Sequence, residues 1–374
     1  MNKVLLGDVA VEHKETCKGS KDGYPIVGLE HLIPEEITLT AWDEGSENTF
    51  SKMFRKGNVL FGRRRAYLKK AAVAPFDGIC SGDITVIEAK PDRILPELLP
   101  FIIQNDDLFD FAVGKSAGSL SPRVKWEHLK NYEFKLPDME KQKELAELLW
   151  AMDNTKKSYQ KLIAATDELV KSQFIERFGK PGTDPFGWGL TTLGECCELN
   201  PRKPKDMNTN IDYSFVAMPS VSEDGRIDSS IERPYSEVCK GFTYFGENDV
   251  LFAKITPCME NGKGGVAKKL KNGAGFGSTE FHVLRPIKGI SDPYWIYILT
   301  IFPKFRSDAE KVMTGTGGQR RVPITYLNEY PIALPPIDLQ EQFAAFVRQS
   351  DKSKLLISRL KEFILMGYRG HGKM

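Results

Sequence analysis

Short apolar runs alternate with polar turns over the first 137 residues of the chain. Runs such as VLLGDVAV, YPIVGL, NVLFGRR and ITVIEA are rich in β-branched and aromatic residues, and Gly, Pro, Asn and Asp separate them. This pattern predicts the strands of a mixed, irregular α+β domain. One longer apolar stretch inside the domain, LPELLPFIIQNDDLFDFA at 95–112, predicts a helix.

A helical period begins at Asp138 and continues to Phe178. Its apolar positions alternate between spacings of three and four, which is typical of a helix that pairs with another helix in a coiled coil. The predicted pairing seam comprises Leu145, Leu148, Met152, Tyr159 and Leu162. The Gly/Pro segment GKPGTDPFGW ends the helix. We therefore predict a first domain at 1–137, a long helix at 138–178 and a linker at 179–188.

The second half of the chain repeats the first half in the same order. LGDVA at 6–10 returns as LGECC at 193–197, an offset of 187, and NVLFGR returns as DVLFAK at an offset of 191. RVKWEHL from Arg123 returns as RVPITYL from Arg321, an offset of 198. The repeat predicts a second domain at 189–336, with a helix at 292–313, and a second long helix at 337–374. The seam of that helix comprises Phe343, Phe346, Ile357 and Leu360.

The two long helices are homologous, so each is the simplest pairing partner for the other. The alternative, in which each helix covers only its own domain, stays open. With 374 residues, 41% hydrophobic and 27% charged, the chain has enough apolar material for more than one core. No run is long enough to cross a bilayer, and the start lacks the apolar stretch of a signal peptide, so we expect a cytoplasmic protein.

The stretch GFGSTEFHVLRP at 275–286 offers Ser278, Glu280 and His282, the residue types of a hydrolytic site. Its counterpart in the first copy, CSGDITVIEAKP, has Asp83 in place of Glu280 and no histidine. A catalytic group that matters in one copy is expected to leave a trace in the other, and this one does not. We therefore predict no catalytic residues, and we expect the shared acidic position to anchor a loop.

A different chemistry is suggested by Asp83, Glu88 and Lys90, whose spacing is found in Mg-dependent nucleases, where oxygen ligands hold the ion and a lysine polarises water. The second copy lacks this pattern, so a nuclease is kept as the alternative function. The six cysteines show no CxxC or Cys/His spacing, and no phosphate-binding loop of the GxxxxGK[ST] type occurs. The sequence therefore predicts no metal site.

Basic residues gather in corresponding loops of the two copies, although the net charge is only +2. One loop follows the shared VLF segment and the other precedes the shared R-V segment, and both mix cations with Gly, Ser, Thr or Gln. Cations neutralise phosphates, small residues let the backbone approach, and Arg and Gln can pair with base edges. The predicted DNA-binding residues are Arg63, Arg64, Arg65, Lys69, Lys70, Lys115, Ser116, Ser119, Arg123, Lys254, Lys263, Thr314, Thr316, Gln319, Arg320 and Arg321.

The whole chain resembles the specificity subunit of type I restriction–modification systems. The likeness is carried by GSTEFHVLRP, by R-V-x(4)-L-x-x-Y-x(3)-L-P-P-x(3)-Q at 321–340, by the parallel R-V…L-P…Q at 123–142, and by the junction at 177–199. The resemblance implies two tandem target-recognition domains, each reading half of a bipartite double-stranded DNA site, and long helices that pair as an antiparallel coiled coil and set the spacing.

The resemblance also implies partners and cofactors. The expected partners are two methyltransferase subunits, with restriction/translocase subunits in the full complex, and no membrane. We expect no cofactor on this chain, because S-adenosylmethionine, ATP and Mg belong to the partner subunits in that family. The bases that are read do not follow from the resemblance, since the reading loops are what varies.

Overall fold

The computed structural model describes residues 2–45, 49–118, 120–316 and 318–371, and it describes side chains up to residue 355. The chain divides into two compact units: unit 1 comprises Met1–Gln160 with Ser358–Met374, and unit 2 comprises Lys161–Ile357. The predicted long helices are present as α5 (Met139–Phe178) and α11 (Ile337–His371). The units differ from the predicted domains because the two ends of α5 belong to different cores.

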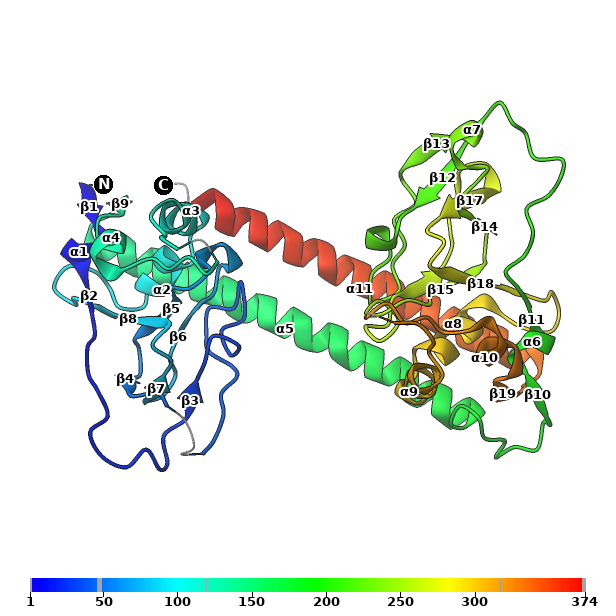
Figure 1. Cartoon of the computed structure of the whole chain (residues 1–374), viewed down its shortest axis with the longest axis horizontal. Helices are drawn as coiled ribbons and strands as arrows, with labels where there is room; N and C mark the ends of the chain where they lie inside the picture. The colour runs from blue at the N-terminus through cyan, green and yellow to red at the C-terminus, as the bar shows by residue number, and fades with distance from the viewer. Residues whose placement is uncertain (1, 46–48, 119, 317, 372–374) are drawn as a thin grey trace. The chain divides into compact units, whose positions relative to one another are not determined.

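Unit 1 contains two small sheets and a separate strand pair (Figure 1). The first sheet has the order β2 (Ala10–Glu12), β8 (Ile84–Ala89), β5 (Val59–Gly62), β6 (Ala71–Val73), and it is antiparallel throughout. The second has the order β3 (Ile26–Val27), β7 (Gly78–Cys80), β4 (Lys52–Phe54), with β3 parallel to β7. The pair joins β1 (Asn2–Leu5) to β9 (Glu133–Leu136).

Unit 2 has the same arrangement with an added strand. Its first sheet has the order β11 (Cys197–Leu199), β18 (Phe281–Pro286), β15 (Val250–Ala253), β16 (Gly264–Val266). Its second has the order β13 (Glu232–Pro234), β12 (Asp212–Val216), β17 (Ala274–Gly277), β14 (Thr243–Gly246), with β12 parallel to β17. The pair joins β10 (Leu190–Thr192) to β19 (Pro331–Ala333).

The sequence repeat is therefore also a repeat of strand register. Phe54 of β4 lies opposite Gly78 of β7, and Phe245 of β14 lies opposite Gly275 of β17. A Cβ atom at Gly78 would come within 2.5 Å of the Phe54 ring, and one at Gly275 within 2.4 Å of the Phe245 ring. Both glycines are required because the facing phenylalanine occupies the space that a side chain would need.

Each helix predicted inside a domain is in fact a pair of helices. The stretch 95–112 contains α2 (Leu99–Ile103) and α3 (Asp106–Gly114), because the Asn105 side chain accepts a hydrogen bond from the Asp107 N–H and starts a new helix. The stretch 292–313 contains α8 (Pro293–Ile301) and α9 (Pro303–Lys311), which are separated at extended Phe302 before Pro303.

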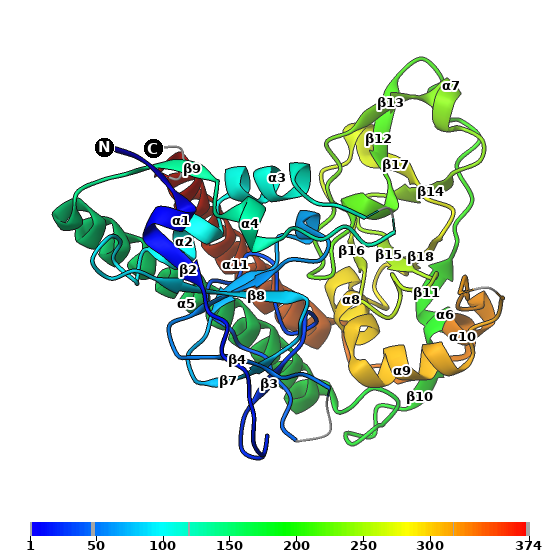
Figure 2. The same cartoon turned by 60° about the vertical axis from the view of Figure 1, so that its left-hand side comes forward.

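The remaining helices are short. They are α1 (Leu6–Val9), α4 (Trp126–Leu129), α6 (Leu193–Cys196), α7 (Tyr235–Val238), α10 (Ile324–Glu329), and the 3-10 turns η1 (Ala66–Leu68), η2 (Met218–Ser220) and η3 (Lys271–Gly273). In both views α8, α9 and α10 lie at one end of unit 2, and the β13–β12–β17–β14 sheet lies at the other (Figures 1 and 2). Within the described ranges, no helix combines the length and apolar character needed to span a membrane.

A buried glutamine fixes the start of each long helix. Gln142 accepts a hydrogen bond from the Leu95 N–H (2.8 Å) and donates to the Pro137 carbonyl (2.9 Å). Gln340, its counterpart at an offset of 198, accepts from the Asp292 N–H (3.0 Å) and donates to the carbonyls of Ile290 and Pro335. The repeated L-P…Q motif is therefore a clamp between the loop before a long helix and the domain beside it.

The predicted seam of α5 needs correction. Leu148 and Leu162 are 46% and 50% exposed. The buried positions of α5 in unit 1 are instead Gln142, Ala146, Leu149, Asp153 and Lys156. The sequence pattern misidentified the face because polar side chains with local partners occupy part of the buried stripe: the Lys156 ammonium, for example, donates to the Glu35 carbonyl at 2.7 Å.

In unit 2 the end of α5 does contact the start of α11. The Phe343 ring packs edge-on against Phe174 and Phe178, with centroids 5.6 and 5.3 Å away, and it also contacts the half-buried Phe346. Further along, the Lys354 ammonium lies 2.9 Å from the Asp167 carboxylate. Leu145, Met152 and Tyr159 are half-buried. The side chains of the two remaining seam residues, Ile357 and Leu360, lie outside the described residues.

Candidate nucleic-acid interface

The basic loops predicted from the sequence meet in unit 1 around Arg123. The Arg65 N–H donates to the Pro122 carbonyl (2.9 Å), and the Val124 N–H donates to the Arg63 carbonyl (3.0 Å). On the other side, Arg123 and Ala117 exchange backbone hydrogen bonds of 3.0 and 3.1 Å. The loop after β5, the loop after α3 and the R-V segment thus form a small three-stranded ladder, which we call hub 1.

Unit 2 builds the same ladder around Arg321, which we call hub 2. The Thr256 N–H donates to the Arg320 carbonyl (3.0 Å), and the Val322 N–H donates to the Lys254 carbonyl (2.9 Å). Arg321 and Thr314 exchange backbone bonds of 2.8 and 3.0 Å. The two loops that precede β8 and β18 also join, because the N–H groups of Arg63 and Lys254 donate to Asp83 and Glu280, respectively.

An ion pair holds the side chains of each hub. The Arg123 guanidinium donates to the two carboxylate oxygens of Asp83 at 2.7 and 3.2 Å, and the Arg321 guanidinium donates to those of Glu280 at 2.9 and 2.8 Å. These bonds lower the pKa of Asp83 and of Glu280 below their usual values. The expectation that the shared acidic position anchors a loop is confirmed.

The ion pairs change the role expected for two predicted contacts. Arg123 and Arg321 are bound to carboxylates of their own chain, so they shape the loops around them. Arg64 joins hub 1 as well, since its Nε donates to the Ser121 hydroxyl (2.5 Å) and its Nη1 lies 3.4 Å from Asp83.

The other predicted residues of unit 1 fall into two groups. Arg65 and Lys115 are exposed, and Arg65 adopts the left-handed conformation with φ of 54°. Lys69 and Lys70 bind their own chain, through the Asp106 carboxylate (2.5 Å) and the Leu29 carbonyl (2.7 Å). The Nε of half-buried Arg63 has no hydrogen-bond partner among the described residues. The hydroxyl of Ser116 donates to the Ala112 carbonyl, and Ser119 lies outside the described residues.

The residues predicted in unit 2 also divide. Lys254 is half-buried, and its ammonium makes no hydrogen bond or ion pair with the described part of the chain. The ammonium of Lys263 lies 3.4 Å from the Met218 carbonyl, and Arg320 lies between Glu260 (3.8 Å) and Glu310 (3.5 Å). The three remaining residues, Thr314, Thr316 and Gln319, are exposed on the loop that precedes Arg321.

The histidine of the Ser278–Glu280–His282 stretch is a structural residue. His282 is 5% exposed, its Nε2 lies 2.8 Å from the Val322 carbonyl, and its Nδ1 lies 3.2 Å from the Asn200 amide nitrogen. The carbonyl can only accept and the amide nitrogen can only donate, so the ring is neutral with its proton on Nε2. Burial lowers its pKa to about 4. The Nδ1 lone pair already accepts a hydrogen bond from Asn200, so His282 has no free nitrogen with which to accept a proton from a substrate.

The three residues of the nuclease alternative are held apart by separate partners. Asp83 binds the arginines of hub 1, Glu88 lies 2.8 Å from His13, and Lys90 donates to the Gly7 carbonyl at 2.7 Å. Among the described residues, one group of acidic and histidine side chains has atoms close enough to share an ion: Glu30, His31 and Asp43. There the His31 Nδ1 already accepts from the Gly28 N–H. Nothing in this arrangement favours the nuclease.

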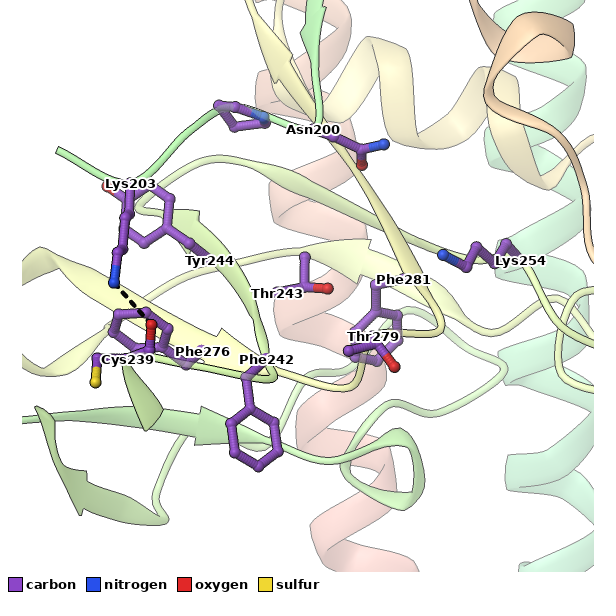
Figure 3. Close-up of a pocket in the computed structure, with 11 residues that line it drawn as sticks. Asn200, Lys203, Cys239, Phe242, Thr243, Tyr244, Lys254, Phe276, Thr279 and Phe281 are labelled. Carbon is purple, nitrogen blue, oxygen red and sulfur yellow. Dashed lines mark hydrogen bonds between the residues drawn. The ribbon is translucent and has the colours of Figure 1, made fainter. Parts of the chain in front are cut away.

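The sequence did not predict the pocket beside hub 2, which Figure 3 shows. It has a volume of about 330 Å³, and Lys254 and Thr279 contribute to its wall together with aromatic residues of the second sheet. Apart from Lys254, which corresponds to the basic Arg63, the residues of its wall have counterparts of other types in unit 1, so no repeated motif marks them.

The comparison with known proteins agrees with the duplicated hubs. Residues 3–165 and 185–365 both match the family model described as "Type I restriction modification DNA specificity domain". The specificity subunit of the type I restriction enzyme EcoEI from Escherichia coli is 36% identical over 225 residues, which is 57% of this chain and 37% of that protein. The EcoAI specificity subunit from the same organism is 39% identical over 165 residues, 44% of this chain and 28% of that protein.

The matched stretches thus span only about a third of the length of these two relatives. Among solved structures, the S subunit of a type I restriction-modification system from M. genitalium aligns with a TM-score of 0.56. Its identity is 12%, and the alignment covers 100% of this chain and 95% of that one, so it indicates a shared fold.

Proposed function

Because the chain belongs to the family of type I restriction modification DNA specificity domains, we propose that it is the DNA-reading subunit of such a system. Each unit reads one half of a bipartite site in double-stranded DNA, and the chain itself performs no catalysis. The observation that carries the proposal is the pair of hubs, in which basic loops far apart in sequence join through the same backbone ladder. Loops held in this way can present cations and amides to a DNA backbone and groove.

The different environments of the basic residues indicate that only some of them contact DNA directly. Arg65 and Lys115 are exposed, and the Lys254 ammonium makes no hydrogen bond or ion pair within the described ranges, so these three can meet phosphates or base edges. Arg123 and Arg321 instead position the loops through their ion pairs. The exposed Gln319 can offer both a donor and an acceptor to an adenine. Ser119, four positions after Lys115 in the sequence, remains a predicted contact.

The long helices are proposed to pair as an antiparallel coiled coil that sets the spacing between the half-sites. The direction is supported in unit 2: Phe178 contacts Phe343, whereas Asp167, eleven positions earlier in α5, contacts Lys354, eleven positions later in α11. A helix of 40 residues is about 60 Å long, enough to relate contacts on successive turns of DNA.

The proposal includes partners on which the chemistry takes place. Two methyltransferase subunits would hold S-adenosylmethionine, and restriction/translocase subunits would use ATP and Mg. The complex would act in the cytoplasm. No residue of this chain is assigned to any of these cofactors.

The test is reconstitution with the methylating partner. Purified chain alone should not methylate DNA, and the mixture should methylate adenines within one bipartite motif, which single-molecule sequencing of the product would identify. Methylation by the chain alone would overturn the proposal, and so would a mixture that methylates adenines without sequence preference.

A second test uses the salt dependence of DNA binding. Arg65→Ala and Lys254→Ala should each weaken binding and reduce the slope of log K against log[salt] by about 1. Lys143→Ala removes an exposed lysine on α5 and is the matched control, which should leave both quantities unchanged. Unchanged slopes in both hub variants would contradict a DNA-binding role for these loops.

A further inference from the structure

The pocket of unit 2 lies between its second sheet and the loop that leads into β18. Tyr244 and Phe276 come from the strands β14 and β17, Thr279 from the turn before β18, Phe281 from the first position of β18, and Lys254 from hub 2 (Figure 3). The pocket has a volume of about 330 Å³, and its wall includes exposed residues, among them Phe242, which is 37% exposed. The pocket therefore adjoins the surface proposed to meet DNA.

The pocket combines aromatic walls with uncommitted polar groups. Phe276 and Phe281 line it from buried positions, each 1% exposed, while Phe242 and Tyr244 remain accessible. The Lys254 side chain extends toward Thr243 in Figure 3. Within the described ranges, neither this ammonium nor the hydroxyl of Thr243 or Thr279 makes a hydrogen bond or ion pair.

The other polar groups of the wall are already engaged. The Asn200 amide binds His282 and the Val283 N–H, and the Lys203 ammonium donates to the Cys239 carbonyl at 2.7 Å. A ligand would thus meet aromatic rings, the hydroxyls of Thr243 and Thr279, and the ammonium of Lys254.

In unit 1 the side chain of Lys52 occupies the place that corresponds to this pocket. Thr243 lies opposite Gly277 in β17, and the residue at the same register position of β4 is Lys52, opposite Cys80. The Lys52 ammonium donates to the carbonyl of Ile84, the counterpart of Phe281, at 2.9 Å, and it lies 3.4 Å from the Glu12 carboxylate. The open pocket of unit 2 thus follows from a small residue where the first copy has a long one.

We propose that this pocket receives one unstacked nucleotide of the DNA bound by unit 2, with its base against the rings of Phe242 and Tyr244 and its phosphate near Lys254. A phosphate alone needs only a surface cation, whereas a hollow lined by aromatic rings beside that cation suits a base removed from the stack. The inference rests on the proposed function and names the class of ligand for part of the same surface.

The test uses the full chain without its partners, so that no other subunit can extrude a base. The duplexes carry the motif found by methylation mapping. In each duplex one base is kept and the base opposite it is replaced, so that a single mismatch weakens that base pair. Extruding a mismatched base from the helix costs less free energy than extruding a paired one. We therefore expect that the duplex with its mismatch at one particular position of one half-site binds about tenfold more tightly than the matched duplex. Mismatches at bases read within the stack should weaken binding about 5- to 100-fold.

Two variants connect the effect to the pocket. Thr243→Lys copies the residue of unit 1 and should abolish the mismatch preference while retaining specific binding. Thr279→Trp blocks the same pocket with a large side chain. Because Thr279 is exposed, this substitution does not alter the buried wall, and the variant should fold and should also lose the mismatch preference. Thr209→Lys places the same charge at an exposed position of unit 2 that does not line the pocket, and it is the matched control that should keep the preference.

Each outcome separates this inference from the proposed function. If no duplex is bound specifically, the proposed function fails. If binding is specific but no mismatch tightens it, or if both pocket variants keep the preference, the inference is overturned while the proposed function stands. If Thr243→Lys tightens matched and mismatched duplexes alike, the pocket is a phosphate site only, and the inference is again overturned.

Discussion

The two units share a framework and differ in what they place around it. Both have the hub ladder, the acid–arginine pair and the glutamine clamp at equivalent positions. They differ in side chains that the shared framework does not require. At the edge of the second sheet unit 1 has Lys52 where unit 2 has Thr243, and in the strand β8 unit 1 has Thr85 where β18 of unit 2 has His282. The features in common hold loops in place, and the differences change what those loops can bind.

The cores at the two ends of α5 show the same contrast in packing. In unit 2, Phe174 is 2% exposed and lies among the rings of Phe178, Trp295, Phe302 and Phe343. In unit 1 the fully buried apolar residues of the helix are the smaller Ala146 and Leu149, while Trp150, which packs edge-on against Phe101, is only partly buried. The end of α5 in unit 2 is therefore the more strongly anchored.

The largest expected effect comes from truncating that anchor. Phe174→Ala should lower the free energy of unfolding of unit 2 by about 4 kcal/mol, and Leu149→Ala that of unit 1 by about 3 kcal/mol, because each leaves a cavity in proportion to the ring or chain removed. Hydrogen exchange of the core strands, resolved by peptide, measures each unit separately. An effect of Phe174→Ala no larger than that of Leu149→Ala would break the comparison.

The glutamine clamps should differ by one hydrogen bond. Gln340→Ala leaves one N–H and two carbonyls without this hydrogen-bond partner, and Gln142→Ala leaves one N–H and one carbonyl. We therefore expect the free energy of unfolding to fall by about 3 and about 2 kcal/mol, respectively. Urea unfolding of the two variants beside the parent chain would measure them. Equal losses would show that the added bond to Ile290 contributes nothing.

Much of the framework follows from the sequence because it is repeated. Arg123 and Arg321, with Asp83 and Glu280, occupy matching positions, and matching positions in two copies must serve the common fold. The predicted DNA-binding residues were less well resolved, since a charge pattern cannot distinguish Lys70, which binds the Leu29 carbonyl, from exposed Arg65.

What the sequence could not predict depends on contacts between distant segments. The face of α5 was misassigned at Leu148 and Leu162 because Lys156 and Asp153 are buried there, each with its own partner. The pocket was missed for a related reason. It exists because Thr243 is short, and the consequence of a short side chain is visible only once the surrounding residues are placed.

The buried histidine gives unit 2 a pH dependence that Thr85 cannot give unit 1. Burial lowers the pKa of His282 to about 4, below its unfolded value of about 6.5. The unfolded state therefore binds the proton more readily, and stability present at pH 7 is lost as pH falls from about 6.5 toward 4, by about 2.5 kcal/mol at pH 4.5. Hydrogen exchange of β18 at both pH values would measure the loss, and His282→Thr should abolish it.

The smallest effect is expected at the hubs. Asp83 is bound by Arg123 and Arg64, whereas among the described residues Glu280 is bound by Arg321 alone, so Asp83→Asn should loosen its loops more than Glu280→Gln. Since the arginines are partly exposed, each change should cost about 1 kcal/mol or less. The pKa of both carboxyls is lowered, so their stabilisation is complete above the usual carboxyl pKa and is lost as pH falls below it.

Hydrogen exchange of the ladder amides of Arg65 and Thr256 would resolve the two hubs. The Arg65 amide should exchange faster in Asp83→Asn, and the Thr256 amide should exchange faster, by a smaller factor, in Glu280→Gln. The same acceleration should occur in the parent chain as pH falls below about 4, after correction for intrinsic exchange rates. If the ladders stay protected in both variants, the backbone bonds hold the loops without the ion pairs, and the acidic position is then not needed as an anchor.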